Sequence, residues 1–175
     1  MLLKSAHQKW EVDFRLLKGM IDPILAGISY QIEHVGSTAI PDLLAKDIID
    51  IDIHLLAPDD FLKVKSKLEE IGYLHTGDQG IRLREVFKRQ GEVDPVLDHI
   101  RHHLYVCRFG CQEFSNHIQF RDYLRSHAEV RSTYQEMKQQ LAAQAKQDKK
   151  KYALLKSEKM NEFFQEVLKK ANEDI

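Results

Sequence analysis

The sequence is poor in several residue types that characterise particular classes of protein. Its 175 residues include two Cys, four Pro and eight Gly. Two thiols cannot form the disulfide framework of a small secreted domain, and so little Pro and Gly excludes collagen-like and low-complexity chains. The formal net charge is −1. The chain therefore has no overall electrostatic attraction for duplex DNA or for an anionic membrane.

Long apolar segments are also missing. No run approaches the roughly 18 apolar residues of a membrane-spanning helix, and residues 1–14 are too charged for a secretion signal. We therefore expect a cytoplasmic protein. The two thiols and four of the histidines could in principle bind a metal, but their spacing matches no zinc module, and such cysteines are usually small hydrophobic residues. These six residues are Cys107, Cys111, His99, His102, His103 and His117.

What the sequence does contain is the composition of a globular protein, with 43% hydrophobic and 30% charged residues. A chain of this length buries roughly 70% of its unfolded surface, which suffices for a core without disulfides or metal. We expect a single domain over residues 1–175, with a mixed sheet core in residues 1–110 and C-terminal helices in residues 111–175.

The spacing of apolar residues predicts an α+β fold, in which a mixed sheet is flanked by helices and followed by a helical C-terminal segment. Helices are expected over residues 7–26 and 58–71, at Pro41, and along most of the chain from Cys111. The expected strands are 29–35, 48–55, 73–75, 81–89 and 102–108, with residues 92–97 pairing back on 81–89 as a hairpin. The lysine run 149–151 is interpreted as a solvated face or a helix junction.

The strand over residues 48–55 carries two carboxylates, Asp50 and Asp52, which project from the same face because side chains alternate along a strand. The isoleucines between them form the opposite, buried face. Two carboxylates about 7 Å apart along a strand repel each other unless a cation lies between them. Mg²⁺ prefers such oxygen ligands and leaves room for substrate phosphates. The pair indicates a metal site, although Asp-x-Asp also occurs on solvent-facing sheet edges.

The loop before this strand indicates a phosphate site. Gly36 allows the backbone to approach a phosphate closely, while Ser37 and Thr38 offer hydroxyl and N–H groups. Lys46 would supply a compensating cation. A Gly-Ser turn alone has little specificity, so this interpretation depends on the two aspartates that follow it.

These motifs together resemble the DNA polymerase beta-like nucleotidyltransferase superfamily, whose signature is a Gly-Ser pair followed by an Asp-x-Asp strand. The chain resembles more closely the GrpB family of small nucleotidyltransferase-like proteins. The resemblance covers nearly the whole chain. It rests on residues 33–38, Pro41, Leu43, residues 45–46 and 48–51, residues 72–73, 84–87, 102–106 and 120–125, and Tyr134, Lys138, Tyr152 and Lys156.

The resemblance implies a sheet of the nucleotidyltransferase type. It also implies a metal-dependent enzyme that moves a nucleotidyl group from a nucleoside triphosphate to an unknown small-molecule or protein acceptor. Asp50 and Asp52 would be catalytic and would hold Mg²⁺, with Mn²⁺ as the alternative. The residues expected to contact the nucleotide or its phosphates are Gly36, Ser37, Thr38, Lys46, Arg84 and Arg121.

Two other functions stay open at this point. The family domain is fused to dephospho-CoA kinase in some proteins, which suggests a non-catalytic module that binds nucleotides or phosphometabolites and is linked to coenzyme A. An interaction protein is the third possibility, and it would need a contiguous apolar patch exposed on residues 130–170.

The resemblance also implies a third acid on a neighbouring strand, where this sequence has none. The strand over residues 102–106 offers His103 and Tyr105 on one face and no carboxylate. His103 could be the third ligand, a general base or a hydrogen-bonded structural residue. The other candidates for the missing ligand are His54, Asp94 and Asp98.

Two further ambiguities concern single residues. An arginine such as Arg84 or Arg121 can bind phosphate oxygens in a bidentate manner, but Arg121 could equally pair with a carboxylate and fix the C-terminal helices to the sheet. The family pattern has Gly where this chain has Asp42, and Pro where it has Asp47. An inward-pointing Asp42 would weaken phosphate binding, whereas a solvent-facing one would be neutral or would favour a helix start.

Overall fold

The predicted α+β fold is confirmed by the computed structural model, which describes residues 1–91 and 94–174. The helices are α1 (His7–Ile24), α2 (Phe61–Glu70), α3 (Gln112–Ser126), α4 (Ala128–Gln144), α5 (Lys149–Lys159) and α6 (Asn161–Glu173), with short 3₁₀ helices η1 (Ser37–Ala39) and η2 (Pro58–Asp60). The strands are β1 (Tyr30–Val35), β2 (Ile49–Leu55), β3 (Tyr73–His75), β4 (Arg84–Arg89) and β5 (His102–Cys107).

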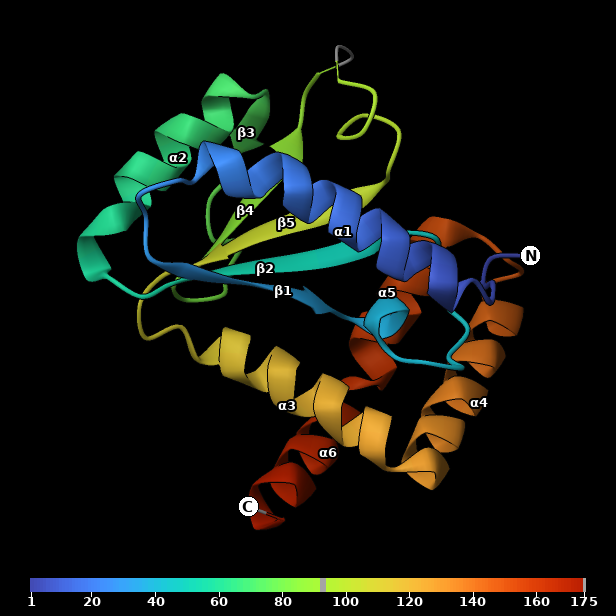
Figure 1. The fold of residues 1–175 in the computed structure, drawn as a ribbon. Coiled ribbons are helices and arrows are strands. Elements are labelled where there is room, and N and C mark those ends of the chain that lie inside the picture. The colour runs from blue at the N-terminus through green and yellow to red at the C-terminus, as the bar shows by residue number, and fades with distance from the viewer. Residues whose placement is uncertain (92–93, 175) are drawn as a thin grey trace.

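The five strands form one mixed sheet in the order β1-β2-β5-β4-β3 (Figure 1). β2 and β5 at its centre are parallel, and the other pairs are antiparallel. Parallel neighbours need a long crossover connection. Here residues 56–101 supply it, and they contain α2 and the β3–β4 pair. The parallel register sets Asp50 beside His103 and Asp52 beside Tyr105.

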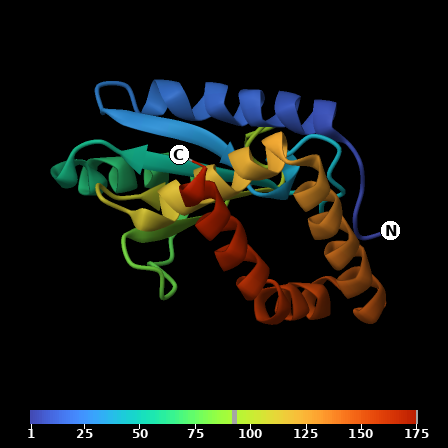
Figure 2. The ribbon, with the colours of Figure 1, turned by 90° about the horizontal axis from the view of Figure 1, so that it is seen from below.

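The two faces of the sheet are covered by different helices (Figure 2). On one face, Trp10 and Leu17 of α1 and Val64 of α2 pack on Ile51 and Ile53 of β2, and all five are fully buried. This confirms the predicted apolar face of β2. α3 lies on the opposite face, where the two aspartates project.

The C-terminal helices build a second hydrophobic cluster beside the sheet. Phe120 of α3, Tyr134 of α4, Tyr152 of α5 and Val167 of α6 belong to it, together with Ile40 from the loop after η1. The predicted helical segment from Cys111 is therefore confirmed. Every helix among the described residues is too short or too polar to serve as a membrane span.

Three local predictions differ from the structure. The expected helix at Pro41 is absent: the short helix lies earlier, at η1, and Asp42 adopts a left-handed backbone (φ +60°) with an exposed side chain. That conformation suits the Gly of the family pattern, and Asp tolerates it better than most residues. Asp42 is exposed, so the structure shows the solvent-facing alternative, for which no repulsion of phosphate was expected.

The other two differences concern the edge of the sheet. The strand predicted from residue 81 begins only at Arg84, because Leu83 has a positive φ (+65°) that an extended strand cannot contain. The predicted hairpin partner 92–97 is wrong for residues 94–97, which form a turn stabilised by the Asp94 carboxylate accepting the N–H groups of Val96 and Leu97. Glu92 and Val93 lie outside the described residues.

Candidate functional site

Gly36 brings the loop after β1 into contact with Asp50. Its backbone is left-handed (φ +72°), and a Cβ built on it would lie 2.3 Å from Oδ2 of Asp50. The side chain of any other residue would collide with this carboxylate, whatever backbone strain it also caused. The glycine of the predicted phosphate loop is thus required by the position of the first aspartate.

Asp50 is paired with His103 across the parallel strands. Oδ1 of Asp50 lies 2.9 Å from Nδ1 of His103, and half of the His103 side chain is exposed. A carboxylate oxygen accepts, so Nδ1 carries the hydrogen and a neutral ring leaves Nε2 as an acceptor. The predicted proximity of His103 to the aspartates is therefore observed, while its role stays a prediction.

Asp52 lies two residues away in very different surroundings. Its side chain is fully buried beneath α3, where Oδ2 accepts a hydrogen bond of 2.7 Å from Nδ1 of His117. Nε2 of His117 lies 3.3 Å from Oε1 of Glu113. The expectation of a shared open polar face therefore holds for Asp50 and not for Asp52.

Charge explains how a fully buried carboxylate is tolerated here. Burial raises the pKa of Asp52, and the hydrogen bond from His117 acts against that shift. Burial alone would lower the pKa of His117, but the hydrogen bonds with Asp52 and Glu113 outweigh it and raise the value to about 10. His117 is therefore a cation between two carboxylates.

Three lysines converge on the other side of Asp50. Lys46, Lys138 and Lys156 line a cavity of about 200 Å³ together with Ser37 and Asp50. Lys138 is almost fully buried and donates to the carbonyl oxygen of Leu44. Burial lowers its pKa well below the usual value, and the charges of Lys156 and Lys46 add to this effect. Burial and the charge of Lys156 also lower the pKa of Lys46.

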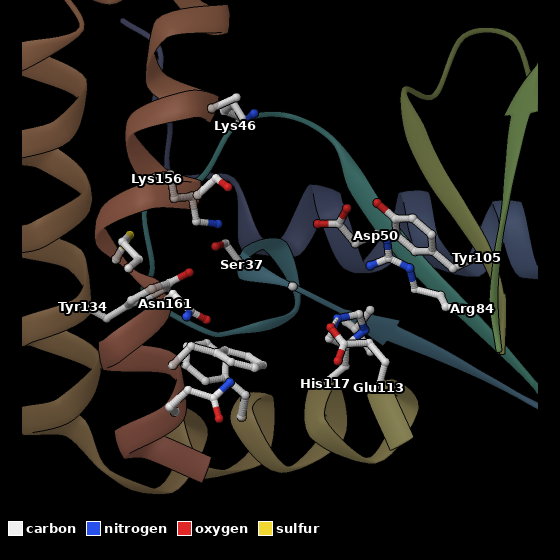
Figure 3. Close-up of a pocket in the computed structure, with 18 residues that line it drawn as sticks. Ser37, Lys46, Asp50, Arg84, Tyr105, Glu113, His117, Tyr134, Lys156 and Asn161 are labelled. Carbon is white, nitrogen blue, oxygen red and sulfur yellow. Dashed lines mark ion pairs between the residues drawn. The ribbon is translucent and has the colours of Figure 1, made fainter. Parts of the chain in front are cut away.

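A larger cavity of about 680 Å³ adjoins the lysines and shares Ser37, Lys46, Asp50 and Lys156 with the smaller one (Figure 3). This volume is typical of small-molecule sites. One wall comes from the sheet and α3, and the opposite wall comes from α4, α5 and α6. The sheet wall contains Val35, Gly36, Asp50, Arg84, Tyr105, Glu113, His117 and Phe120.

Arg84 fulfils the expectation that it lies in the site. Its guanidinium stacks over the Tyr105 ring at 4.8 Å, and its buried Nε finds no hydrogen-bond acceptor among the described residues. Arg121 does not line this cavity. It pairs with Glu33 (2.7 Å) and Asp122 (2.7 Å) and donates to the carbonyl of His34, which favours its alternative role of fixing α3 to β1.

Thr38 is also occupied inside the protein. Its hydroxyl donates to the carbonyl of Ile48 and contacts Nε2 of His34 at 2.9 Å, and the residue is buried. Burial lowers the pKa of His34 to about 4, so that ring is neutral and donates to Thr38. Thr38 lines the smaller cavity, but its hydroxyl is already engaged inside the protein, and its contact with a phosphate stays a prediction.

The alternative third ligands lie away from the aspartates. Asp94 caps the turn over residues 94–97, and Asp98 forms an ion pair of 2.5 Å with Arg89. Neither residue lines the two cavities that contain Asp50, so the structure favours neither as the third ligand. His54 shares the face of Asp50 and Asp52 but stacks on Phe114 of α3 at 4.4 Å and does not line the cavity.

The oxygen atoms present fit a hard divalent cation. Oδ1 of Asp52 is buried without a hydrogen-bond partner in the described part of the chain, and Oδ2 of Asp50, against Gly36, carries no hydrogen bond there either. Each carboxylate therefore gives one oxygen to a histidine and keeps the other. No group of three His, Cys, Asp or Glu among residues 1–91 and 94–174 is arranged to hold a metal, so water or phosphate oxygens would have to complete the ligand set.

Sequence reasoning did not place four side chains of this site beside the aspartates, and it considered one of them, His117, only as a metal ligand together with the thiols. Glu113 and His117 have the spacing of four that places two residues on one face of a helix, which was their only local signal. Lys138 and Lys156 appear in the family resemblance, but no spacing links them to the aspartates. The considered thiol site is absent: Cys107 and Cys111 are buried with Phe114.

Comparison of the sequence with known proteins identifies the family of this chain. The family model described as GrpB protein matches residues 1–170. Glutamate-rich protein GrpB from Alkalihalophilus pseudofirmus is 29% identical over 167 residues, which are 95% of each chain. UPF0157 protein YqkA from Bacillus subtilis is 31% identical over 138 residues, and the match spans 79% of this chain but 38% of that longer protein.

Solved structures agree with this result. The crystal structure of GrpB from Enterococcus faecalis has a TM-score of 0.78 and 27% identity, and 98% of each chain is covered. A poly(U) polymerase, Cid1, solved with MgATP, has a TM-score of 0.57 at 14% identity, covering 83% of this chain and 45% of that one. Likeness at this identity shows a shared fold. The predicted sheet of the nucleotidyltransferase type is thereby confirmed.

Proposed function

The chain belongs to the GrpB family, and we propose that it is a metal-dependent nucleotidyltransferase that moves a nucleotidyl group from a nucleoside triphosphate to a small-molecule or protein acceptor. One observation carries the proposal: Lys46, Lys138 and Lys156 converge beside Asp50 and Ser37 around the smaller cavity. That cavity shares Ser37, Lys46, Asp50 and Lys156 with the larger one, whose volume is sufficient for a nucleotide.

The lysines are the residues that would bind the triphosphate. Burial lowers the pKa of Lys46 and Lys138, and the charge of Lys156 lowers both further, whereas Tyr134 raises the pKa of Lys156. The cluster therefore favours an anion of several charges. Attraction in a partly buried cavity is stronger than in water. Ser37 can add its hydroxyl and backbone N–H from the loop, since it lines both cavities.

Asp50 and Asp52 would hold Mg²⁺ through the oxygens that the histidines leave open, with Mn²⁺ as the alternative. When bound, the metal would neutralise charge that develops on the transferred and leaving phosphoryl groups. His117 and Glu113 keep Asp52 oriented. His103, fixed by Asp50, presents Nε2 as a general base for the acceptor hydroxyl.

A second function is favoured by one specific observation. β5 carries His103 and Tyr105 where the superfamily pattern has its third acid. A site without that acid could bind nucleotides or phosphometabolites, coenzyme A among them, without transfer. The third function, an interaction protein, would need a contiguous exposed apolar patch over residues 130–170. Of the large hydrophobic residues there, Leu154 alone is exposed, and a single side chain is no such patch.

Calorimetric titration tests the proposal. The wild type and the Asp50→Asn/Asp52→Asn variant are titrated with ATP, CTP, GTP, UTP and coenzyme A, in Mg²⁺ and in chelator. We expect nucleotide binding in Mg²⁺ that the variant loses, with circular dichroism showing that it stays folded. Unchanged metal-dependent affinity in the variant would exclude the aspartate assignment. Binding without transfer of an α-phosphate label to any acceptor would favour the second function.

A further inference from the structure

The end of α5 and the start of α6 line the larger cavity. The residues that they contribute are spaced by one and three positions, so those within each helix lie on one face of that helix. They are Ala153, Lys156, Ser157, Met160, Asn161, Phe164 and Gln165. The charge changes along the face, because it begins with the Lys156 ammonium beside the phosphate loop and continues with uncharged side chains.

Two amides on this face have no partner. Asn161 and Gln165 are exposed, lie one helical turn apart, and make no hydrogen bond with any described residue. Two amides elsewhere on the helices are engaged: Gln119 donates to Asn172, and Gln135 accepts from the backbone of Leu44. A carboxamide offers two donors and an acceptor, so the two free amides present a mixed hydrogen-bonding edge to the cavity.

An aromatic surface lies between these amides. Phe164 is half-buried and packs against Phe120 with a centroid distance of 4.8 Å. Tyr134 and Phe120 complete this part of the lining, and Figure 3 places Tyr134 and Asn161 across the cavity from Tyr105 and Arg84. A flat apolar ring with polar edge atoms would therefore meet both the ring and the amides of this wall.

We infer that this face of α5 and α6 is the subsite for the nucleobase, where the base stacks on Phe164 and its edge bonds to Asn161 and Gln165. The inference rests on the proposed function, because the triphosphate must lie on the lysines for the base to reach this wall. It assigns base recognition to the C-terminal helices and leaves phosphate and metal binding to the loop, the lysines and β2.

Tripolyphosphate separates the two proposals, since it has the phosphates of a nucleotide and no base. Its dissociation constant is measured by calorimetry in Mg²⁺ beside those of ATP, CTP, GTP and UTP. We expect the preferred nucleotide to bind at least about tenfold more tightly than tripolyphosphate, because stacking on an aromatic side chain contributes about that factor. Nucleotides that all bind no better than tripolyphosphate would overturn the inference and leave the phosphate site standing.

Four variants locate the effect. Phe164→Leu keeps an apolar side chain against Phe120, and it should remove most of the tenfold factor without changing tripolyphosphate affinity. Asn161→Ala and Gln165→Ala, both at exposed positions, should make the dissociation constants of ATP, CTP, GTP and UTP more alike. Gln140→Ala removes an exposed amide of α4 outside the cavity. It should change neither nucleotide affinity nor tripolyphosphate affinity.

The remaining outcomes are also decisive. Unaltered nucleotide preference in both amide variants would overturn the inference even if Phe164→Leu failed to fold. If tripolyphosphate does not bind at all, the result would contradict the proposed function. It would then also overturn the inferred nucleobase subsite, which rests on that function.

Discussion

The two walls of the cavity satisfy their polar groups in opposite ways. On the sheet wall, the carboxylates have protein partners: Asp50 pairs with His103, and Asp52 pairs with His117, which also contacts Glu113. Arg84 differs from them, because its buried Nε has no acceptor among the described residues. On the helical wall, the amides Asn161 and Gln165 are unpaired among the described residues, and the lysines repel one another. The sheet wall is thus organised before any ligand arrives, while the helical wall gains its partners from the ligand.

Removing the first aspartate breaks the sheet wall and should have the largest effect. Asp50→Asn takes away a metal ligand and the carboxylate that orients His103. We expect the transfer rate to fall by on the order of 10²–10³-fold, as for the loss of one group that stabilises transition-state charge. Tripolyphosphate binding in chelator should stay equal or improve, because a negative charge beside the lysines is lost. Weaker binding in chelator would contradict this division of roles.

Gly36→Ala tests the contact between the loop and the sheet wall. The new Cβ would lie 2.3 Å from Oδ2 of Asp50 and on a left-handed backbone, which itself costs about 1–2 kcal/mol. We expect lower stability in denaturant titration and the loss of metal-dependent nucleotide binding. Gly27→Ala is the matched control: its φ is +83°, and a Cβ there meets nothing within 4 Å. Gly27→Ala should lose less stability, because it strains the backbone without a clash, and it should keep nucleotide binding.

Lys138→Met tests the helical wall. Methionine has a similar length, and it removes a buried ammonium that its neighbours repel. We expect stability to be equal or higher, while tripolyphosphate affinity falls about tenfold, the equivalent of about 1.4 kcal/mol. Lys150→Met, on the exposed start of α5, should alter neither quantity. Loss of stability without loss of affinity would make Lys138 a structural residue.

The smallest expected effect is a dependence of binding on pH. Because the pKa values of Lys46 and Lys138 are lowered, these groups lose their protons at a lower pH than ordinary lysines. A bound polyphosphate favours the charged forms, so binding takes up protons. Affinity should therefore fall as pH rises, and the fall should begin below the usual lysine pKa of about 10.4. Calorimetry in two buffers of different ionisation enthalpy measures the uptake, and proton release on binding would contradict it.

Much of the sheet wall could be predicted because its information is local. The alternation over residues 48–55 places Asp50 and Asp52 on one face, and the Gly36-Ser37 turn precedes them closely. His103 could be proposed because it lies on the next strong strand. The burial of each aspartate could not be predicted from the sequence. Asp50 and Asp52 share a face of β2, yet the side chain of Asp50 is partly exposed and that of Asp52 is fully buried beneath α3.

The helical wall could not be derived from spacing. Lys138 reaches Leu44 across 94 positions of sequence, a relation that depends on how α4 packs against the loop after η1. Arg121 and Thr38 show the converse, because both lie close to the motif and use their polar groups to support it from behind. Asp98 was considered as a third metal ligand because the sequence does not show where residues 94–101 run. In the structure, its carboxylate forms an ion pair with Arg89.

The parallel pairing of β2 with β5 has a consequence for how the protein is made. Asp50 meets its histidine 53 positions later, Asp52 meets His117 after 65, and the lysine cluster closes only when α5 is in place. Contacts of such long range form slowly, because chain entropy is lost before they stabilise the fold. A nascent chain on the ribosome thus carries the complete Gly-Ser and Asp-x-Asp motif for most of its synthesis before the partners of these residues exist. Under the proposed function, a nucleotide would assist only the last stage of folding.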